Sequence, residues 1–243
     1  MRIAALALLA LALSGCESTQ QKSAQLEKAA LAHEKAIGGN PAHHGLSIIH
    51  LSTRVHVLST TLIKGAEGTA VVVTLANTSA TAIRDVPIAL AVSDAQGAVV
   101  YTNSAPGLSQ SLVSVPLIPA HGQGVWVDDQ VAASGTPATA SAKVGEGTAV
   151  TGPIPLMTVE QAHVFEESAT STGAEGNIVN HSTIEQQELL VDALALRAGK
   201  IVAAGRAVIQ QVPAGVPTRF QLYFTGSPKG AQLQVTAPAS TFE

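Results

Sequence analysis

The sequence predicts an all-β protein with two tandem β-sandwich domains. Ala, Val, Gly, Thr and Ser dominate a chain of 243 residues, whereas charged residues make up 12% and aromatic residues 3%. Several stretches alternate apolar and polar side chains with a period of two, which is typical of strands that bury one face. One pattern of turn residues occurs twice, about one hundred residues apart, and a single domain commonly has that length.

The N-terminus predicts an exported protein with a lipid anchor. The apolar run Ile3–Leu13 fits a signal peptide and is too short to span a bilayer, which needs roughly 20 helical residues. Leu13, Ser14 and Gly15 precede Cys16, and together they resemble the lipobox of bacterial lipoproteins. The resemblance implies cleavage before the cysteine, a diacylglyceryl group on its sulfur and an acylated amine. We therefore expect a lipoprotein signal peptide over 1–15 and membrane attachment through lipid on Cys16.

Charge and cysteine content narrow the possible partners. The net charge is −4 and Cys16 is the only cysteine, so no internal disulfide can form. No basic face for nucleic acid is expected. The sequence has no G-x-S-x-G elbow and no phosphate-cradling glycine loop. We expect no enzymatic activity and no cofactor, and a place in the bacterial cell envelope, facing the periplasm or the cell exterior.

A tether is predicted between the lipid and the first domain, over residues 16–44. The stretch "AQLEKAALAHEKAI" contains no Gly or Pro and mixes apolar with charged residues, so part of the tether is expected to be helical. Gly38-Gly39-Asn40-Pro41 ends that helix.

The first sandwich is expected over residues 45–152. The stretches "IIHLSTRVHVLSTTLI" and "TAVVVTLAN" are rich in β-branched residues and indicate strands. The clearest hairpin is "VPIALAVSDAQGAVVYTN", in which alternate residues are large and apolar and Asp94-Ala95-Gln96-Gly97 makes the turn. Pro87 lacks a backbone donor, which predicts an edge strand or the start of a strand.

The second sandwich is expected over residues 153–243. "ELLVDALALRAGKIVAAGRAVIQQ" indicates two strands joined by a turn at Arg197-Ala198-Gly199-Lys200. "RFQLYF" and "AQLQVTA" each alternate with a period of two. Between the domains, "VTGPIPLMTVEQ" predicts a short, stiff linker and a restricted relative angle, because its glycine and prolines interrupt strand pairing.

Comparison of the two halves indicates an internal repeat. Asn77-Thr78-Ser79 and Asn180-His181-Ser182 are each followed by a glycine-containing hairpin turn and then by a proline-marked turn. The distance in sequence from the hairpin turn to the proline-marked turn is longer in the first copy than in the second, which predicts an insertion near Tyr101 to Gln110. Seven or so short strands in each copy predict an immunoglobulin-like sandwich.

These repeated motifs resemble a known family. "VVVTLANTSATAIRDVPIALAVSDAQGAVV" and "GNIVNHSTIEQQELLVDALALRAGKIVAAGRAVIQQVPAG" are similar to FxLYD-type immunoglobulin-like modules of bacterial envelope proteins. That family pairs an N-x-[ST] turn with a D-x-x-G-x-V-V hairpin and a P-x-G turn. The second copy departs from the pattern, since it has Leu-Arg-Ala-Gly where an acidic turn is usual. The resemblance implies a fold and leaves the activity open.

Histidines are the first candidates for chemistry. His33, His43, His44, His50 and His56 lie close together in the sequence and suggest a copper or zinc site, with His43, His44 and His50 as the possible ligands. Adjacent histidines point to opposite sides of a strand, and no ligand-like cysteine, methionine or carboxylate lies nearby. Exposed histidines on the tether and the first strand are the favoured interpretation.

Three further residue types are candidates for binding. Asp128-Asp129 suggests a calcium or acid–base pair, although a strand end with solvated charge is the favoured interpretation. Trp126 is expected to fill a sandwich core. Asn77 and Asn180 have the glycan-acceptor form but are better interpreted as turn residues that tolerate left-handed backbone.

The predicted lipid anchor, the internal repeat and the lack of catalytic motifs together predict a non-catalytic binding or adaptor module for another extracytoplasmic protein or wall component. A strand edge or the loops at one end of a sandwich are the expected contact surfaces. The alternative is a metal-handling envelope lipoprotein that uses the histidines from His33 to His56.

Overall fold

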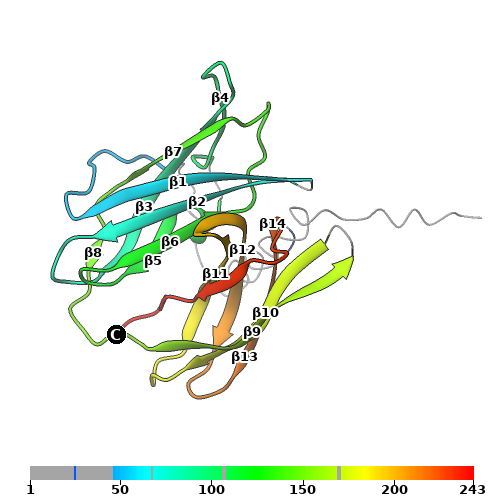
Figure 1. Ribbon diagram of the computed structural model, residues 1–243. Helices are drawn as coiled ribbons and strands as arrows, with labels where there is room; N and C mark the ends of the chain where they lie inside the picture. Colours follow the sequence, from blue (N-terminus) through cyan, green and yellow to red (C-terminus); the bar gives the residue numbers. More distant parts are fainter. Residues whose placement is uncertain (1–24, 26–45, 67, 106–107, 169–170) are drawn as a thin grey trace, which may run out of the picture.

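The computed structural model describes residues 25, 46–66, 68–105, 108–168 and 171–243 (Figure 1). The described chain is all-β, and its antiparallel sheets pack against each other as sandwiches, as the sequence predicts. The predicted signal peptide and nearly all of the predicted tether lie outside the described residues.

The first sandwich is formed by two antiparallel sheets around a core of aliphatic side chains. One sheet has the order β1-β2-β6, formed by β1 (Val55–Gly65), β2 (Gly68–Asn77) and β6 (Gln123–Asp128). The other is centred on β3 (Ile83–Ser93), which pairs with β4 (Val99–Thr102), β5 (Ser114–Ile118), β7 (Thr139–Val144) and β8 (Thr148–Ala149). A 3-10 turn, η1 (Gln110–Leu112), precedes β5. Trp126 is fully buried in this core, which confirms the interpretation as a core residue.

The second sandwich repeats this arrangement. One sheet has the order β13-β10-β9, formed by β9 (Met157–Ser168), β10 (Ser171–Asn180) and β13 (Thr218–Tyr223). The other has the order β14-β12-β11-β15, formed by β11 (Gln186–Arg197), β12 (Lys200–Val212), β14 (Thr225–Gly226) and β15 (Gln232–Thr236). Phe220 and Leu222 of β13 point into the core while Gln221 is exposed, as the period-two pattern predicts.

The predicted hairpins are present in both halves. β3 buries Val86, Ile88, Leu90 and Val92, and Asp94 Oδ1 accepts hydrogen bonds from the backbone N–H groups of the turn that follows. In the second half, β11 and β12 are joined by two residues only, Ala198 (φ 49°) and Gly199 (φ 75°). Two central residues with positive φ suit a tight hairpin because they match the twist of its strands.

The predicted edge position of Pro87 is wrong. β3 is the central strand of its sheet: it pairs with β8 at Ile83–Arg84 and with β7 at Ile88–Ser93, and Pro87 lies between the two pairings. The Pro87 carbonyl accepts a hydrogen bond from Gly145 N at 2.8 Å. A proline is tolerated here because the neighbouring ladder is already interrupted, so no partner carbonyl needs its missing N–H.

The insertion predicted near Tyr101 to Gln110 divides one strand into two. β12 runs unbroken along β11, whereas its counterpart in the first sandwich is split into β4 and β5 by the chain from Asn103 to Val113. Asn103 is buried and bridges the gap. Its Oδ1 accepts from Leu90 N at 2.7 Å, and its Nδ2 donates to Ile88 O at 2.9 Å and Leu112 O at 2.7 Å. The side-chain amide thus replaces the missing backbone partner of β3.

Asn77 and Asn180 form the same lock in the two sandwiches. Both are buried, and each side-chain oxygen accepts from the N–H and hydroxyl of the serine two residues later. Asn77 Nδ2 donates to Thr81 O, Ile118 O and Pro119 O, and Asn180 Nδ2 donates to Ile184 O and Val212 O. Neither asparagine has a positive φ, so the left-handed interpretation is wrong. The amide group itself explains the residue choice.

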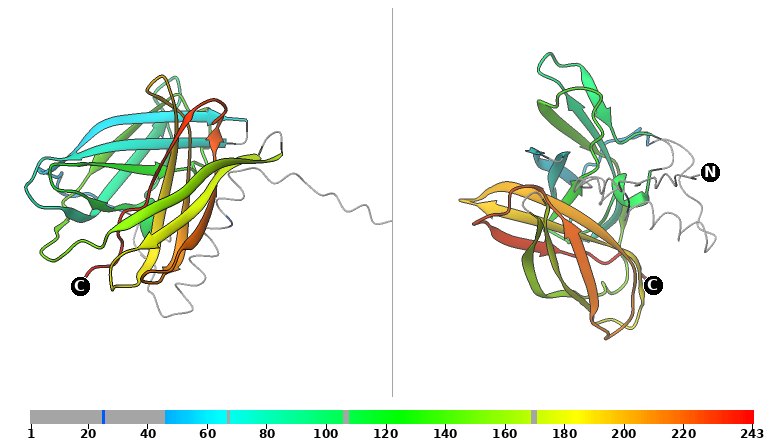
Figure 2. Two further views of the ribbon diagram at one scale, coloured as in Figure 1. Left: turned by 60° about the horizontal axis from the view of Figure 1, so that its bottom comes forward. Right: turned by 90° about the vertical axis from the view of Figure 1, so that its right-hand side faces the viewer.

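The two sandwiches pack through unlike faces (Figures 1 and 2). The outer face of β1-β2-β6 contributes Ile63, Ala70, Val72 and Val127, and the outer face of β11-β12 contributes Leu194 and Ala204. These six side chains are all buried and form a core separate from those inside each sandwich. The chain end also returns to the first sandwich, where Ala239 packs with Ala82 and Leu117.

Candidate functional site

A cluster of buried polar residues lies beside the apolar core between the sandwiches. Asp128 and Asp129 follow Trp126 at the end of β6, and Asp192 and Arg206 face each other as partners on β11 and β12. All four are at least 98% buried. The interpretation of Asp128-Asp129 as solvated charge is therefore wrong: the second sandwich covers this strand end.

Asp128 is held from two sides. Tyr101 donates from its hydroxyl to Asp128 Oδ2 at 2.7 Å, and the Gln130 backbone N–H donates to Asp128 Oδ1 at 2.9 Å. Burial, followed by the nearby Asp128 carboxylate, raises the pKa of Tyr101. The hydroxyl therefore stays protonated and remains a donor.

Arg206 connects the two sandwiches. Its backbone N–H donates to Asp129 Oδ2 at 3.2 Å, and its guanidinium Nη2 donates to the Ser111 hydroxyl. Both partners belong to the first sandwich: Asp129 directly follows β6, and Ser111 lies in η1. A buried guanidinium next to carboxylates stabilises them in a region from which water is excluded.

Asp192 is the unusual member of the cluster. Neither of its carboxyl oxygens has a hydrogen-bond partner among the described residues. Burial raises its pKa to about 8, because the Arg206 charge only partly offsets desolvation and the Asp129 carboxylate adds to it. At neutral pH the folded protein therefore holds Asp192 mainly as the neutral acid.

An open groove of about 560 Å³ runs beside this contact. One wall is formed by the β1-β2-β6 sheet with hydroxyl and amide side chains and Val125. The other is formed by the β11-β12 hairpin, with apolar side chains and Lys200, together with Gln234 of β15. The lining residues are Ser59, Thr61, Thr74, Gln123, Val125, Leu194, Leu196, Gly199, Lys200, Ile201 and Gln234. The groove thus offers both apolar area and polar partners, and its size falls in the usual range for ligand sites.

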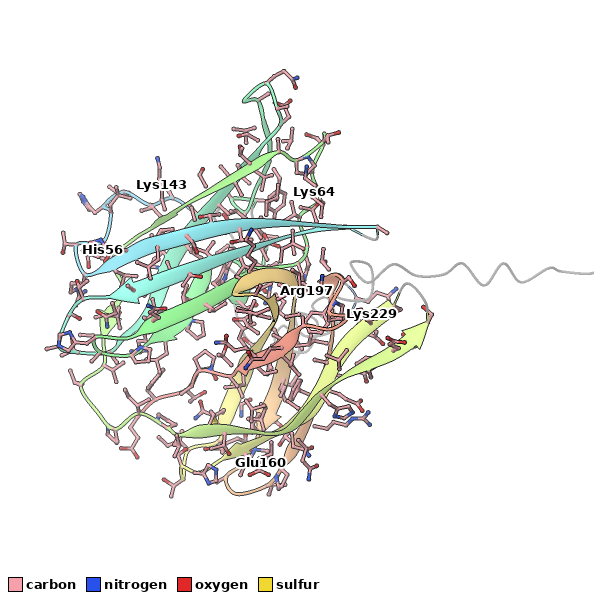
Figure 3. All side chains as sticks on the ribbon, in the orientation of Figure 1. His56, Lys64, Lys143, Glu160, Arg197 and Lys229 are labelled. Atoms are coloured by element: carbon pink, nitrogen blue, oxygen red, sulfur yellow. The ribbon has the colours of Figure 1, made fainter. Side chains whose placement is uncertain are left out.

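The histidine candidates are not brought together by the described part of the chain. His50 and His56 are both exposed, and His56 lies near the start of β1 (Figure 3). Among the described residues, no group of three His, Cys, Asp or Glu side chains is placed to hold a metal ion. His33, His43 and His44 lie outside the described residues, as do Leu13, Ser14, Gly15 and Cys16.

Sequence reasoning missed Asp192 and Arg206, although a signal for them exists. Asp192 interrupts the apolar run Leu189–Leu194, and Arg206 stands alone among small and apolar residues of the next strand. The tight turn at Ala198-Gly199 places them opposite each other. An isolated acid and base at paired positions within apolar strands indicates a buried, covered pair rather than a solvated one.

No protein-family model and no curated protein matches this chain. Within the described residues, no helix combines the length and the apolar character that a membrane span requires.

Proposed function

We propose that this chain is a lipid-anchored protein of the bacterial cell envelope that binds another extracytoplasmic protein or wall component without catalysis. The lipobox-like residues Leu13 to Cys16 support the anchor. Acyl chains contribute about 0.8 kcal/mol per buried methylene, and more than one chain is needed for a stable anchor. The FxLYD-like motifs in both copies support an envelope module that faces the periplasm or the cell exterior.

The observation that carries the binding role is the groove between the sandwiches. Both sandwiches contribute to its walls, and the buried contact beside it holds those walls in place. Ligand sites occur preferentially where two domains meet. A preformed groove loses less conformational entropy on binding than a flexible surface does.

Co-purification from detergent-solubilised envelopes tests this role. Ser59→Tyr fills the groove from the β1 wall, and Lys200→Glu reverses the charge on the hairpin wall. Ser141→Tyr and Lys143→Glu are matched controls, because both residues are exposed on β7, away from the groove. We expect a reproducible partner that the groove variants lose and the β7 variants retain. Repeated recovery of no partner, or equal recovery by all variants, contradicts the proposal.

The anchor is tested separately by mass spectrometry of the native N-terminal peptide. We expect a peptide that begins at acylated Cys16. An unmodified thiol, or a chain that still carries Met1, contradicts the anchor.

A further inference from the structure

The outer face of the β9-β10-β13 sheet carries polar and aromatic side chains in three cross-strand rows. In an antiparallel sheet, side chains directly opposite each other lie side by side on one face. The register of β10 with β9 and β13 places His163, Glu175 and Gln221 in one row and Phe165, Gly173 and Tyr223 in the next. The remaining row holds Glu160, Asn177 and Arg219, and Gln161, at the register shift beside Glu160, accepts a hydrogen bond from Asn177 Nδ2 at 3.4 Å.

The outer face of β9-β10-β13 is exposed to solvent in the described chain, whereas the corresponding face of the first sandwich is covered by the second. The corresponding sheet of the first sandwich, β1-β2-β6, buries Val72 and Val127 of its outer face under the second sandwich. Along β9-β10-β13, Gln161, His163, Arg219 and Gln221 are all exposed. The two copies of one sheet therefore carry different surfaces, apolar where a neighbour packs and polar where none of the described chain does.

The polar side chains of this face hold each other in place. Glu175 accepts from Arg219 and lies 3.2 Å from His163 Nε2, while His163 Nδ1 lies 3.0 Å from Gln161 O. The hydrogen bond from Arg219 lowers the pKa of Glu175 and keeps it ionised. The face thus presents a guanidinium, an imidazole, a carboxylate and amides in fixed positions, which reduces the entropy that ligand binding must overcome.

The aromatic row supplies apolar area beside these groups. The rings of Phe165 and Tyr223 lie 5.7 Å apart at 74°, and they meet over Gly173. A Cβ at Gly173 would lie 2.6 Å from two Phe165 ring carbons, so only glycine allows the ring to lie down on the sheet. Gln221 Nε2 donates to Tyr223 Oη at 3.2 Å, which links the aromatic row to the polar row.

We propose that this outer face of β9-β10-β13 binds a neutral oligosaccharide. Pyranose rings combine an apolar C–H face with hydroxyls that both donate and accept, which matches aromatic area beside amides, carboxylate and guanidinium. Arg219 is paired with Glu175 and Glu160 adds a second carboxylate, so the face has no excess of arginine and lysine over acidic side chains that would attract an acidic polymer. The inference narrows the proposed envelope role to one ligand class and depends on that role for its biological setting.

Titration calorimetry of the full-length protein in detergent micelles tests the proposal. The probes are soluble oligomers of β-1,4-linked N-acetylglucosamine and of β-1,4-linked glucose. We expect at least one to bind with a dissociation constant of about 1 mM or tighter. Arg219→Ala removes one exposed donor group and should weaken binding about tenfold. Arg197→Ala, an exposed arginine on the β11-β12 hairpin (Figure 3), should leave it unchanged.

Two further variants test the aromatic row by the same calorimetric titration. Phe165→Ala removes one ring, and thermal unfolding checks that the variant still folds. Tyr223→Phe keeps the other ring and removes only its hydroxyl. Both should weaken binding severalfold. No binding of any oligosaccharide at about 1 mM, binding that these variants leave intact, or binding of a polypeptide alone would each overturn the inference. If no oligosaccharide binds but a partner still co-purifies through the groove, the oligosaccharide inference is wrong and the proposed adaptor role is unaffected. Oligosaccharide binding by a chain whose Cys16 is not acylated supports the inference and removes the anchor.

Discussion

Single asparagines determine how each sandwich closes. The amide nitrogens of Asn77 and Asn180 each donate to two or three backbone carbonyls at strand ends and in turns, and each side-chain oxygen accepts from the following turn. A serine two residues later completes the lock in both copies. The N-x-S motif is thus a folding element here, and its buried nitrogen is not available for a glycan.

Asn180→Ala should therefore lower the free energy of unfolding by about 2 kcal/mol or more, because buried carbonyls lose their donors. Urea unfolding followed by circular dichroism measures the change. Asn177→Ala, on the same strand but on its solvent side with a single long bond of 3.4 Å, is the control and should change stability by less than about 0.5 kcal/mol. Equal effects at the two positions would contradict the lock.

Asp192 should make stability depend on pH. Its pKa rises from 3.8 in the unfolded chain to about 8 in the folded protein, so the folded form retains a proton that the unfolded form releases between these values. The corresponding stability is fully present below pH 3.8, declines as the pH rises, and is lost above the folded pKa. Asp192→Asn keeps a neutral group and should raise the melting temperature more at pH 9 than at pH 5.

Thermal unfolding of the wild type and the Asp192→Asn variant at both pH values measures this difference. Asp94→Asn is the control for a general change in charge, because this half-buried turn residue keeps its Oδ1 acceptor in the variant. If the change in melting temperature caused by Asp192→Asn differs between pH 5 and pH 9 no more than the change caused by the control, the Asp192 carboxyl group is solvated.

At the scale of elements, hairpins follow from local sequence, whereas strand partners do not. The Asp94–Gly97 and Ala198–Gly199 turns were predictable because turn chemistry and alternation are local. Pro87 was misinterpreted because the change of partner from β8 to β7 depends on residues far along the chain. The insertion near Tyr101 was predictable from unequal spacing, but the bridging role of Asn103 depends on three carbonyl and amide groups that meet only in the folded sheet.

The crossing of β12 and β13 depends on a glycine. A Cβ at Gly205 would lie 2.0 Å from Tyr223 O, which is backbone and cannot move aside. Gly205→Ala should therefore destabilise the protein by about 3 kcal/mol or more, because the strands must separate. Chemical unfolding measures this, and Gly152→Ala is the control, since nothing lies within 4 Å of a Cβ there. A small effect at Gly205 would show that the strands pack less closely.

At the scale of the whole molecule, the contact between the sandwiches fixes their relative angle. Its apolar part centres on Ala204 against Ile63, Ala70, Val72 and Val127, and its polar part on Arg206 against Asp129. The sequence predicted a restricted angle from the linker alone. The buried side chains that form the contact come from β1, β2, β6, β11 and β12, and their pairing could not be inferred from residue order.

Ala204→Arg should separate the sandwiches without unfolding either one, because the new side chain has no space in this contact. Small-angle X-ray scattering should show a larger radius of gyration, while circular dichroism retains its β signature. Ala214→Arg, at an exposed turn position, is the control and should leave the radius unchanged. An unchanged radius for Ala204→Arg would mean that the linker alone sets the angle.

The outer face of β1-β2-β6 packs against a different face of the second sandwich, that of β11-β12, and this affects how such units can assemble. When two units pack through the same face, the pair is symmetric and has no such face left for a third unit. When one face of a unit packs against a different face of the next, the same contact can be made again by a further unit. Repetition of the same contact would therefore build an open array and not a closed pair. The corresponding outer face of β9-β10-β13 carries Glu175, Arg219 and their polar neighbours, so it offers no apolar side chains for a further contact of the same kind.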